Sequence, residues 1–211
     1  MKRNAKNRLL ISTILVPSCL LLALLFCPLK GWAANQGGHE STRIRMANLE
    51  AICLVHALKM VRWNENDLPA GDEPVKCLVV GKDSNNFSQR LSFLLSESNT
   101  TISGRKIIVL GVEKAKDALV MAEGGGDVAL VVVLESVAGE WSKSVYPKRS
   151  GLLVYGQGER FSGNGTILSS KIYNNRVKFS VNQKRAESSG LELSPAMLSH
   201  KRAFSVEQVE D

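Results

Sequence analysis

The sequence predicts an α/β fold in three layers, in which a mostly parallel sheet has helices on both faces and is extended by a C-terminal antiparallel hairpin. Two observations predict it. Short apolar runs alternate with helical patterns from residue 76 to residue 155, and this order is typical of a parallel sheet flanked by helices. Further on, two β-type runs at residues 166–173 and 176–181 flank Asn174 and Asn175, residue types that accept the positive φ of a tight turn.

The length and composition suit one folded domain. The chain has 211 residues, of which 44% are hydrophobic and 22% are charged. Apolar content at this level supplies a core of ordinary size and excludes disorder as the main state of the chain. We therefore expect a single α/β domain over residues 43–205, followed by a short tail over residues 206–211.

The first 33 residues have the three parts of a secretory signal peptide. A basic start is followed by the apolar run Leu9–Leu29 and then by Gly31-Trp32-Ala33, which has small residues at its first and third places. Cleavage after Ala33 leaves a polar, glycine-rich stretch at residues 34–42, which we expect to be a flexible arm. The alternative is an uncleaved membrane anchor, because the apolar run is close to the minimum length of a membrane span.

Removal of this segment changes the charge of the chain. Residues 1–33 contain five Lys or Arg residues and no Asp or Glu, so the formal net charge falls from +7 to +2. Nucleic-acid binding thereby loses its main support, and no stable membrane insertion is expected after cleavage. The pattern predicts export across the cytoplasmic membrane.

The first element of the domain is expected to be a helix over residues 43–63, because this segment has no Gly or Pro and has apolar residues at helical spacing. Leu54, Leu58 and Val61 add a second apolar stripe, and a helix that is apolar nearly all round is buried on more than one side. Two explanations remain open. Either the helix is sandwiched within its own domain, or this stripe contacts a partner protein or a second copy of the chain in a homodimer.

The remaining elements alternate along the chain. Short apolar runs predict buried parallel strands, and Asp83 or Ser84 is expected to cap the helix that contains Phe87 and Leu91. The expected strands are residues 76–81, 106–112, 128–134 and 151–155. The further helices are expected at residues 113–123, 136–146, 183–188 and 195–203.

The motifs of common catalytic and metal sites are missing from the sequence. It contains no Gly-x-Ser-x-Gly nucleophile motif and no His-Glu-x-x-His metal motif. The three histidines, His39, His56 and His200, do not form a pair at ligand spacing. We therefore expect no enzymatic activity, no metal and no cofactor.

An open parallel sheet still has a crevice at the carboxyl ends of its strands. Lys82, Asp83 and Ser84 follow the first of the four predicted strands and fall at this edge. Their polar groups and the helix N-terminus suit a small anionic ligand. The alternative is a solvated turn that only caps the following helix.

Two cysteines remain after signal cleavage, Cys53 and Cys77. In an oxidising compartment they either form one disulfide or stay unpaired as small apolar residues of the core. The residues themselves leave both outcomes open.

The C-terminal part contains a recognisable series of motifs. Phe161-Ser162-Gly163-Asn164-Gly165 is followed by Asn175-Arg176-Val177-Lys178-Phe179-Ser180-Val181-Asn182 and then by Gly190-Leu191-Glu192-Leu193-Ser194. The series resembles the YfiR-like family of small bacterial periplasmic proteins, and the resemblance extends over roughly residues 45–203. Many members of that family have a cysteine at the start of the third strand. Here that place is Asp127 or Val128, so Cys53 is the partner left for Cys77.

The resemblance implies regulation without catalysis. YfiR-like proteins are periplasmic repressors that bind the periplasmic part of an inner-membrane diguanylate cyclase and hold it inactive, which lowers cyclic di-GMP signalling and biofilm formation. The motif residues are then structural: glycines before the hairpin (Gly163, Gly165), a hairpin-end contact (Arg176), a core side chain (Phe179) and a helix cap (Asn182). The alternative function is a periplasmic small-ligand binding or sensor protein that works with a transporter or receptor.

Overall fold

The computed structural model describes residues 30–141, 147, 149–161, 165–174, 176–199 and 204–206. The chain divides into two compact units, Met1–His39 and Glu40–Asp211. In the first unit the described residues, 30–39, are helical. No helix in the described part of the chain is both long enough and apolar enough to cross a membrane.

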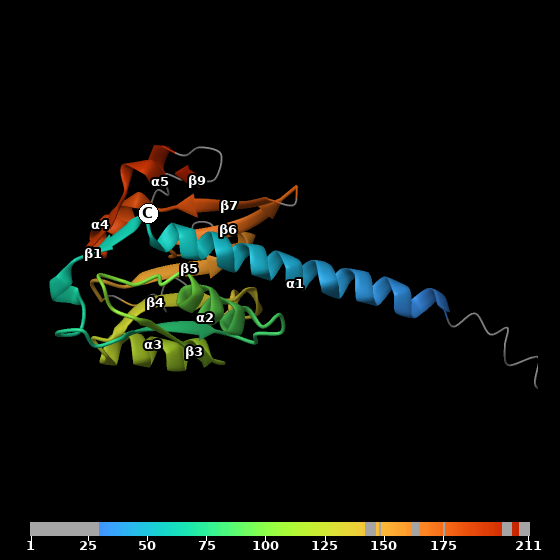
Figure 1. The fold of residues 1–211 in the computed structure, drawn as a ribbon, viewed down its shortest axis with the longest axis horizontal. Helices are drawn as coiled ribbons and strands as arrows, with labels where there is room; N and C mark the ends of the chain where they lie inside the picture. Colours follow the sequence, from blue (N-terminus) through green and yellow to red (C-terminus); the bar gives the residue numbers. More distant parts are fainter. Residues whose placement is uncertain are drawn as a thin grey trace, which may run out of the picture. The chain divides into compact units, whose positions relative to one another are not determined.

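A seven-stranded sheet forms the centre of the second unit (Figure 1). Its strands are β2 (Val75–Val80), β3 (Ile107–Val112), β4 (Val128–Val133), β5 (Leu153–Gln157), β6 (Leu168–Tyr173), β7 (Arg176–Val181) and β9 (Phe204–Val206). Their order in the sheet is β3-β2-β4-β5-β6-β7-β9. Among these described strands, β6 and β7 are the one antiparallel pair. The mostly parallel sheet and the C-terminal hairpin are therefore confirmed.

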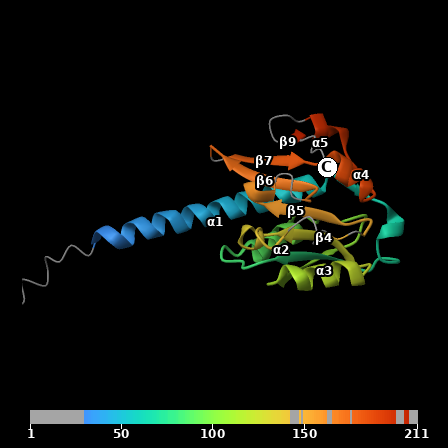
Figure 2. The ribbon, with the colours of Figure 1, turned by 180° about the vertical axis from the view of Figure 1, so that it is seen from behind.

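Helices cover both faces of the sheet, as predicted (Figures 1 and 2). On one face α1 (Lys30–Leu58) and α2 (Phe87–Glu97) share a core cluster with Cys77 and Val79 of β2. On the other face the small buried alanines of α3 (Ala115–Gly124) share a second cluster with Leu78 and Val80. Successive side chains of β2 thus enter two different cores, which explains why its sequence is apolar throughout.

The first helix ends earlier than the sequence predicts. It stops at Leu58, and Val61–Trp63 forms a short strand, β1, which pairs with β8 (Leu191–Leu193) in a separate antiparallel sheet. Along β1 the residues are buried, exposed and buried in turn, which is the period of a strand. Residues 34–42, for which the sequence predicts a loose arm, belong to α1.

The prediction that Leu54, Leu58 and Val61 contact a partner is wrong. Their exposed fractions are only 0%, 3% and 6%. The reason is that the C-terminal elements join the core around the helix: the cluster that holds this stripe also contains residues of α4 (Gln183–Ser188), β8 and α5 (Pro195–Ser199). The helix is sandwiched within its own domain, and the reason for placing it in a dimer interface disappears.

One other helix is shorter than expected. The described part of the predicted helix 136–146 contains a 3-10 turn, Glu135–Val137, and then turn residues up to Gly139 and Glu140. Residues 142–146 lie outside the described residues. The last predicted helix, residues 195–203, contains α5 (Pro195–Ser199), and residues 200–203 lie outside the described residues. Further 3-10 turns occur at Glu65–Asp67 and Glu159–Phe161.

Phe179 and Asn182 are found where the motif places them, in the core and at the start of a helix. Phe179 is 2% exposed and lies in the core. The side chain of Asn182 accepts a hydrogen bond of 2.9 Å from the backbone N–H of Arg185, and so caps α4. Arg176 is the last residue paired at the hairpin end, opposite Tyr173. Gly165 has a positive φ of 81°, whereas Gly163 lies outside the described residues.

Both cysteines are free thiols, so the structure does not contain the disulfide that the sequence leaves open. Cys77 is wholly buried in β2, and Cys53 packs against the same core cluster while remaining partly accessible. Burial raises the pKa of both thiols. The two residues therefore serve as small apolar side chains of the core.

Candidate functional site

A cavity of about 750 Å³ opens at the carboxyl ends of β2, β4 and β5. This is the edge at which parallel sheets commonly bind ligands, and the volume suits a small molecule. One wall comes from α1, with Arg43, Met46 and Glu50, and the β6–β7 hairpin contributes Ile172. We call this space the strand-end cavity.

The structure places all three predicted crevice residues, Lys82, Asp83 and Ser84, on the wall of the strand-end cavity. The Asp83 carboxylate also caps α2: it accepts hydrogen bonds from the backbone N–H groups of Phe87 (2.7 Å) and Ser88 (2.8 Å). On the other side, Ser136 Oγ accepts a hydrogen bond of 2.9 Å from the Lys82 N–H. The loop after β2 is thus fixed from two directions, which leaves the Lys82 side chain exposed at the cavity rim.

A buried carboxylate forms the inner wall of the cavity, and the sequence analysis missed it. Glu50 is only 4% exposed. Its Oε1 accepts a hydrogen bond of 2.6 Å from Ser170 Oγ, and its Oε2 accepts one of 2.7 Å from Gln157 Nε2. The Tyr155 hydroxyl donates in turn to Ser170 Oγ at 2.7 Å. Glu50 is the one acidic residue in the mostly apolar segment 47–58, and this is the one signal in the sequence that points to the network.

The electrostatics of Glu50 follow from its surroundings. Burial raises the pKa of its carboxyl, the hydrogen bonds from Ser170 and Gln157 lower it, and the charge of Glu135 raises it further, so that the net shift is upward. Burial also raises the pKa of Tyr155, and the charge of Glu50 adds to that shift. No Lys or Arg in the described part of the chain forms an ion pair with Glu50.

Charges of both signs surround the cavity. The positive side chains on its lining are Arg43, Lys82 and Arg160, and the negative ones are Glu50, Asp83 and Glu135. Apolar surface between them comes from Met46 and Phe87, among others. Such a lining suits a small polar molecule with an apolar portion. In the described residues, His, Cys, Asp and Glu side chains do not gather in any group that could hold a metal ion.

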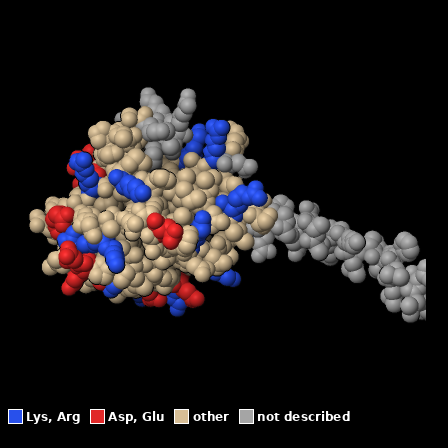
Figure 3. Space-filling model, in the orientation of Figure 1, with Lys and Arg blue, Asp and Glu red and all other residues tan. Residues whose placement is uncertain are grey.

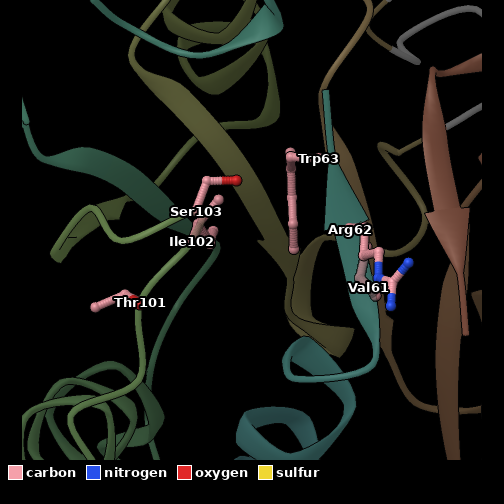
Figure 4. A pocket seen from close by; sticks show the side chains of 6 residues that line it. All are labelled: Val61, Arg62, Trp63, Thr101, Ile102 and Ser103. Atoms are coloured by element: carbon pink, nitrogen blue, oxygen red, sulfur yellow. The ribbon is translucent and has the colours of Figure 1, made fainter. Parts of the chain in front are cut away.

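A smaller pocket of about 310 Å³ lies between β1 and residues 101–103 (Figure 4). In Figure 4 the Trp63 ring stands between the strand and this loop, and Arg62 points away from it. The Trp63 indole N–H is buried and has no hydrogen-bond partner in the described part of the chain. With few polar groups converging on it, this pocket is a weaker ligand site than the strand-end cavity.

Large apolar side chains are exposed mainly in two regions of the described surface. Ile108 of β3 (44% exposed) and Val120 and Met121 of α3 (64% and 37%) lie on elements that contact each other. Ile44 of α1 and Ile172 and Tyr173 of the hairpin form the second region, while Phe93 is exposed on α2. We call Ile108, Val120 and Met121 the α3–β3 surface.

Comparisons with known proteins agree with the motifs. A family model described as YfiR/HmsC-like matches residues 47–200. No curated protein matches the chain at a significant level. A solved structure of a conserved domain protein from Vibrio cholerae O1 biovar El Tor str. N16961 is 15% identical, with a TM-score of 0.48, and the match covers 74% of this chain and 60% of that one.

A second solved structure is that of CD0873 in its ligand-free, open state, a substrate binding protein with adhesive properties from Clostridium difficile. It is 12% identical, with a TM-score of 0.41, and the match covers 64% of this chain and 55% of that one. The chain therefore spans less than two thirds of the length of either protein.

Proposed function

The chain belongs to the YfiR/HmsC-like family, and we propose that it is a periplasmic regulatory protein that represses an inner-membrane diguanylate cyclase by direct contact. The repressor binds the periplasmic part of the cyclase and keeps it inactive, which lowers cyclic di-GMP and restrains biofilm formation. The observation that carries the proposal is the family match, which extends over residues 47–200 and so over most of the folded unit. The signal-peptide pattern of residues 1–33 supports export to the compartment where this contact takes place.

A repressor that acts by contact needs an accessible apolar surface. The stripe of Leu54, Leu58 and Val61 is buried, so the contact lies elsewhere. The α3–β3 surface supports this role, because three large apolar side chains are exposed on two neighbouring elements. Val120, the most exposed of them, is its central residue in this proposal.

The test compares two helix residues that are both apolar and exposed. In cells that lack the gene and express the cyclase, the wild-type protein is expected to lower cyclic di-GMP and to co-purify with the cyclase from membranes. Val120→Asp is expected to weaken that binding by tenfold or more. Phe93→Asp, which makes the same change on α2 (Phe93 is 51% exposed), should bind like wild type.

The possible outcomes test the repressor function and the role of the α3–β3 surface separately. An unchanged cyclic di-GMP level on gene deletion, with the cyclase expressed, contradicts the repressor function. Normal repression by Val120→Asp contradicts only the α3–β3 assignment. The intact mass of the purified protein shows whether it starts near Ala34, as cleavage predicts.

The strand-end cavity favours a second candidate function, a periplasmic small-ligand binding or sensor protein that works with a transporter or receptor. Its volume of about 750 Å³ and its buried Glu50 are features of ligand sites. The two candidates differ in the membrane protein that they retain. Co-purification of a transporter or receptor in place of a cyclase would favour the second.

A further inference from the structure

We propose that the tip of the β6–β7 hairpin, together with the adjacent turn of α1, binds the surface of an anionic phospholipid bilayer. The surface consists of Lys171, Tyr173, Arg176 and Lys178 on the hairpin and of Arg43 and Arg45 on α1. We call it the basic end. Binding of the basic end to a bilayer does not depend on the identity of any protein partner.

The two segments that form the basic end contain no acidic residue, although Glu50, Asp83 and Glu135 line the neighbouring strand-end cavity. Residues 41–49 and 165–182 contain no Asp or Glu. In the face seen in Figure 3, the part of the surface beside the hairpin shows blue Lys and Arg side chains without red acidic ones. In the described part of the chain, none of the six residues forms an ion pair with a carboxylate; the ion pairs found there involve Arg62, Lys76 and Arg105. The charge at this end of the molecule is therefore available to an anionic partner.

The strand register gathers the hairpin charges on one face. Lys171 lies directly opposite Lys178, and Tyr173 lies opposite Arg176. Opposite residues of an antiparallel pair project from the same face, as do residues two apart along a strand, so these four side chains share a face. Like charges directly opposite each other destabilise a hairpin. Lys178 Nζ lies 5.3 Å from the centroid of the Tyr173 ring, which offsets only part of this repulsion, and an anionic surface would remove it.

The helix turn lies at the same end of the molecule. Arg43 and Ile172 line the same strand-end cavity, so the hairpin tip reaches the part of α1 that carries Arg43, Ile44 and Arg45. Ser170 and Phe179 face α1 and its core, so the alternating side chains of Lys171 and Lys178 project from the opposite face of the sheet. A bilayer would therefore meet the cations of both elements only end-on, at the hairpin tip.

Exposed apolar side chains distinguish a bilayer from other anionic partners. Tyr173 is 58% exposed, Ile172 40% and Ile44 39%. Tyr173 shares a face with the hairpin cations, Ile44 lies between Arg43 and Arg45 in the sequence, and Ile172 projects from the hairpin face that is turned towards α1. Cations next to an exposed aromatic ring and aliphatic side chains are typical of proteins that bind at a membrane interface, because the charges meet the headgroups while the apolar groups enter the boundary with the acyl chains. The tip is also a projection, whereas a peptide or small ligand needs a groove or cavity.

The experiment measures binding of the exported protein, as recovered from the cell, to two kinds of vesicle. One contains phosphatidylcholine alone, and the other contains phosphatidylcholine mixed with phosphatidylglycerol. We expect binding to the anionic vesicles only, and weaker binding as salt is added. Removing two charges in the double variant Lys171→Gln, Lys178→Gln should lower the partition coefficient roughly 30-fold. The matched double variant Lys114→Gln, Lys116→Gln, at the start of α3, should bind like wild type.

A local measurement keeps the test independent of the N-terminal segment. Anionic vesicles should slow hydrogen exchange at the tip amides, residues 172–177, and leave α3 unchanged. Equal binding to both kinds of vesicle, an equal loss in both double variants, or unprotected tip amides would each overturn the proposal. Binding of the basic end to an acidic protein without any binding to phosphatidylglycerol vesicles would also overturn it.

Discussion

At the scale of single residues, Glu50 stands out as a buried carboxyl with a raised pKa. A carboxyl with a raised pKa stays protonated in the folded state at pH values where the unfolded chain has already lost its proton. Its contribution to stability is therefore present at low pH, and it is lost as the pH rises above the ordinary value of 4.5 towards the higher folded pKa. The hydrogen bonds from Ser170 and Gln157 reduce this loss without reversing it.

Glu50→Gln tests the sign of this effect. The amide has no proton to lose, so the free energy of unfolding of the variant, relative to wild type, should rise as the pH increases from about 4.5. The difference in the free energy of unfolding between variant and wild type cannot change by more than about 1.4 kcal/mol per pH unit. Urea denaturation at several pH values measures it, and because the other titrating groups are common to both proteins, they cancel. Parallel curves would show that Glu50 titrates normally in the folded chain.

Residues of the site differ in how far sequence could predict them. Lys82 and Asp83 were found because they follow a strand directly, so their position is a local property of the chain. Glu50 was missed because its partners Gln157 and Ser170 are 107 and 120 residues away. A Glu inside an apolar helix is a faint signal until those distant side chains are known to satisfy it.

At the scale of elements, α1 contributes to stability through its packing against the sheet and the C-terminal elements. Leu54→Ala, at a side chain with no exposed surface, should lower the free energy of unfolding by about 2–5 kcal/mol, because it removes buried methyl groups and leaves a cavity. Ile44→Ala on the same helix is the control: Ile44 is 39% exposed, so the cost should be at most about 1 kcal/mol. Chemical denaturation measures both. Similar values for the two variants would contradict the sandwiched position of the helix.

The same contrast between local and distant information explains which elements the sequence predicts. The alternation of strands and helices from residue 76 to residue 155 is encoded locally, in apolar runs and caps. The structure confirms it except between β4 and β5, where the described residues contain a 3-10 turn in place of the predicted helix. Val61–Trp63 reads as the end of a helix because three residues are too few to show a strand period. Its partner, Leu191–Leu193, lies near the other end of the chain. Pairing of this kind is decided by the whole fold.

At the scale of the whole molecule, the carboxyl and amino ends of the sheet strands differ in the contacts that they make. The carboxyl ends of the strands border the strand-end cavity and the basic end. At the amino ends, the Arg149 guanidinium joins separate loops: Nη1 donates to the carbonyl oxygens of Gly125 (2.6 Å) and Val128 (2.9 Å), and Nη2 donates to that of Asp67 (3.1 Å). Burial lowers the pKa of Arg149. This end of the sheet is stabilising, and the other end is where binding is proposed.

Arg149→Lys tests this division of tasks. A single ammonium group cannot reproduce a planar fork that reaches several carbonyls, so the free energy of unfolding should fall by about 2 kcal/mol or more. Arg62→Lys is the matched control: Arg62 and Glu192 form an ion pair of 3.7 Å with side chains that are 75% and 70% exposed, so its loss should cost less than about 1 kcal/mol. Thermal unfolding compares the two. The folded Arg149→Lys variant should bind anionic vesicles as wild type does. Weaker vesicle binding by this variant would show that the amino ends of the strands influence binding at the carboxyl ends.

The free thiols Cys53 and Cys77 have a consequence for how the protein responds to its redox surroundings. Because no disulfide joins Cys53 to Cys77, no crosslink between them restricts the conformations of the unfolded chain. Folding therefore needs no oxidant to form that bond, and a reducing agent has no bond there to break. The midpoint of thermal unfolding is therefore the same with and without a reducing agent. Any direct response of the described fold to an oxidant would then begin at Cys53, the partly accessible thiol, because Cys77 is wholly buried.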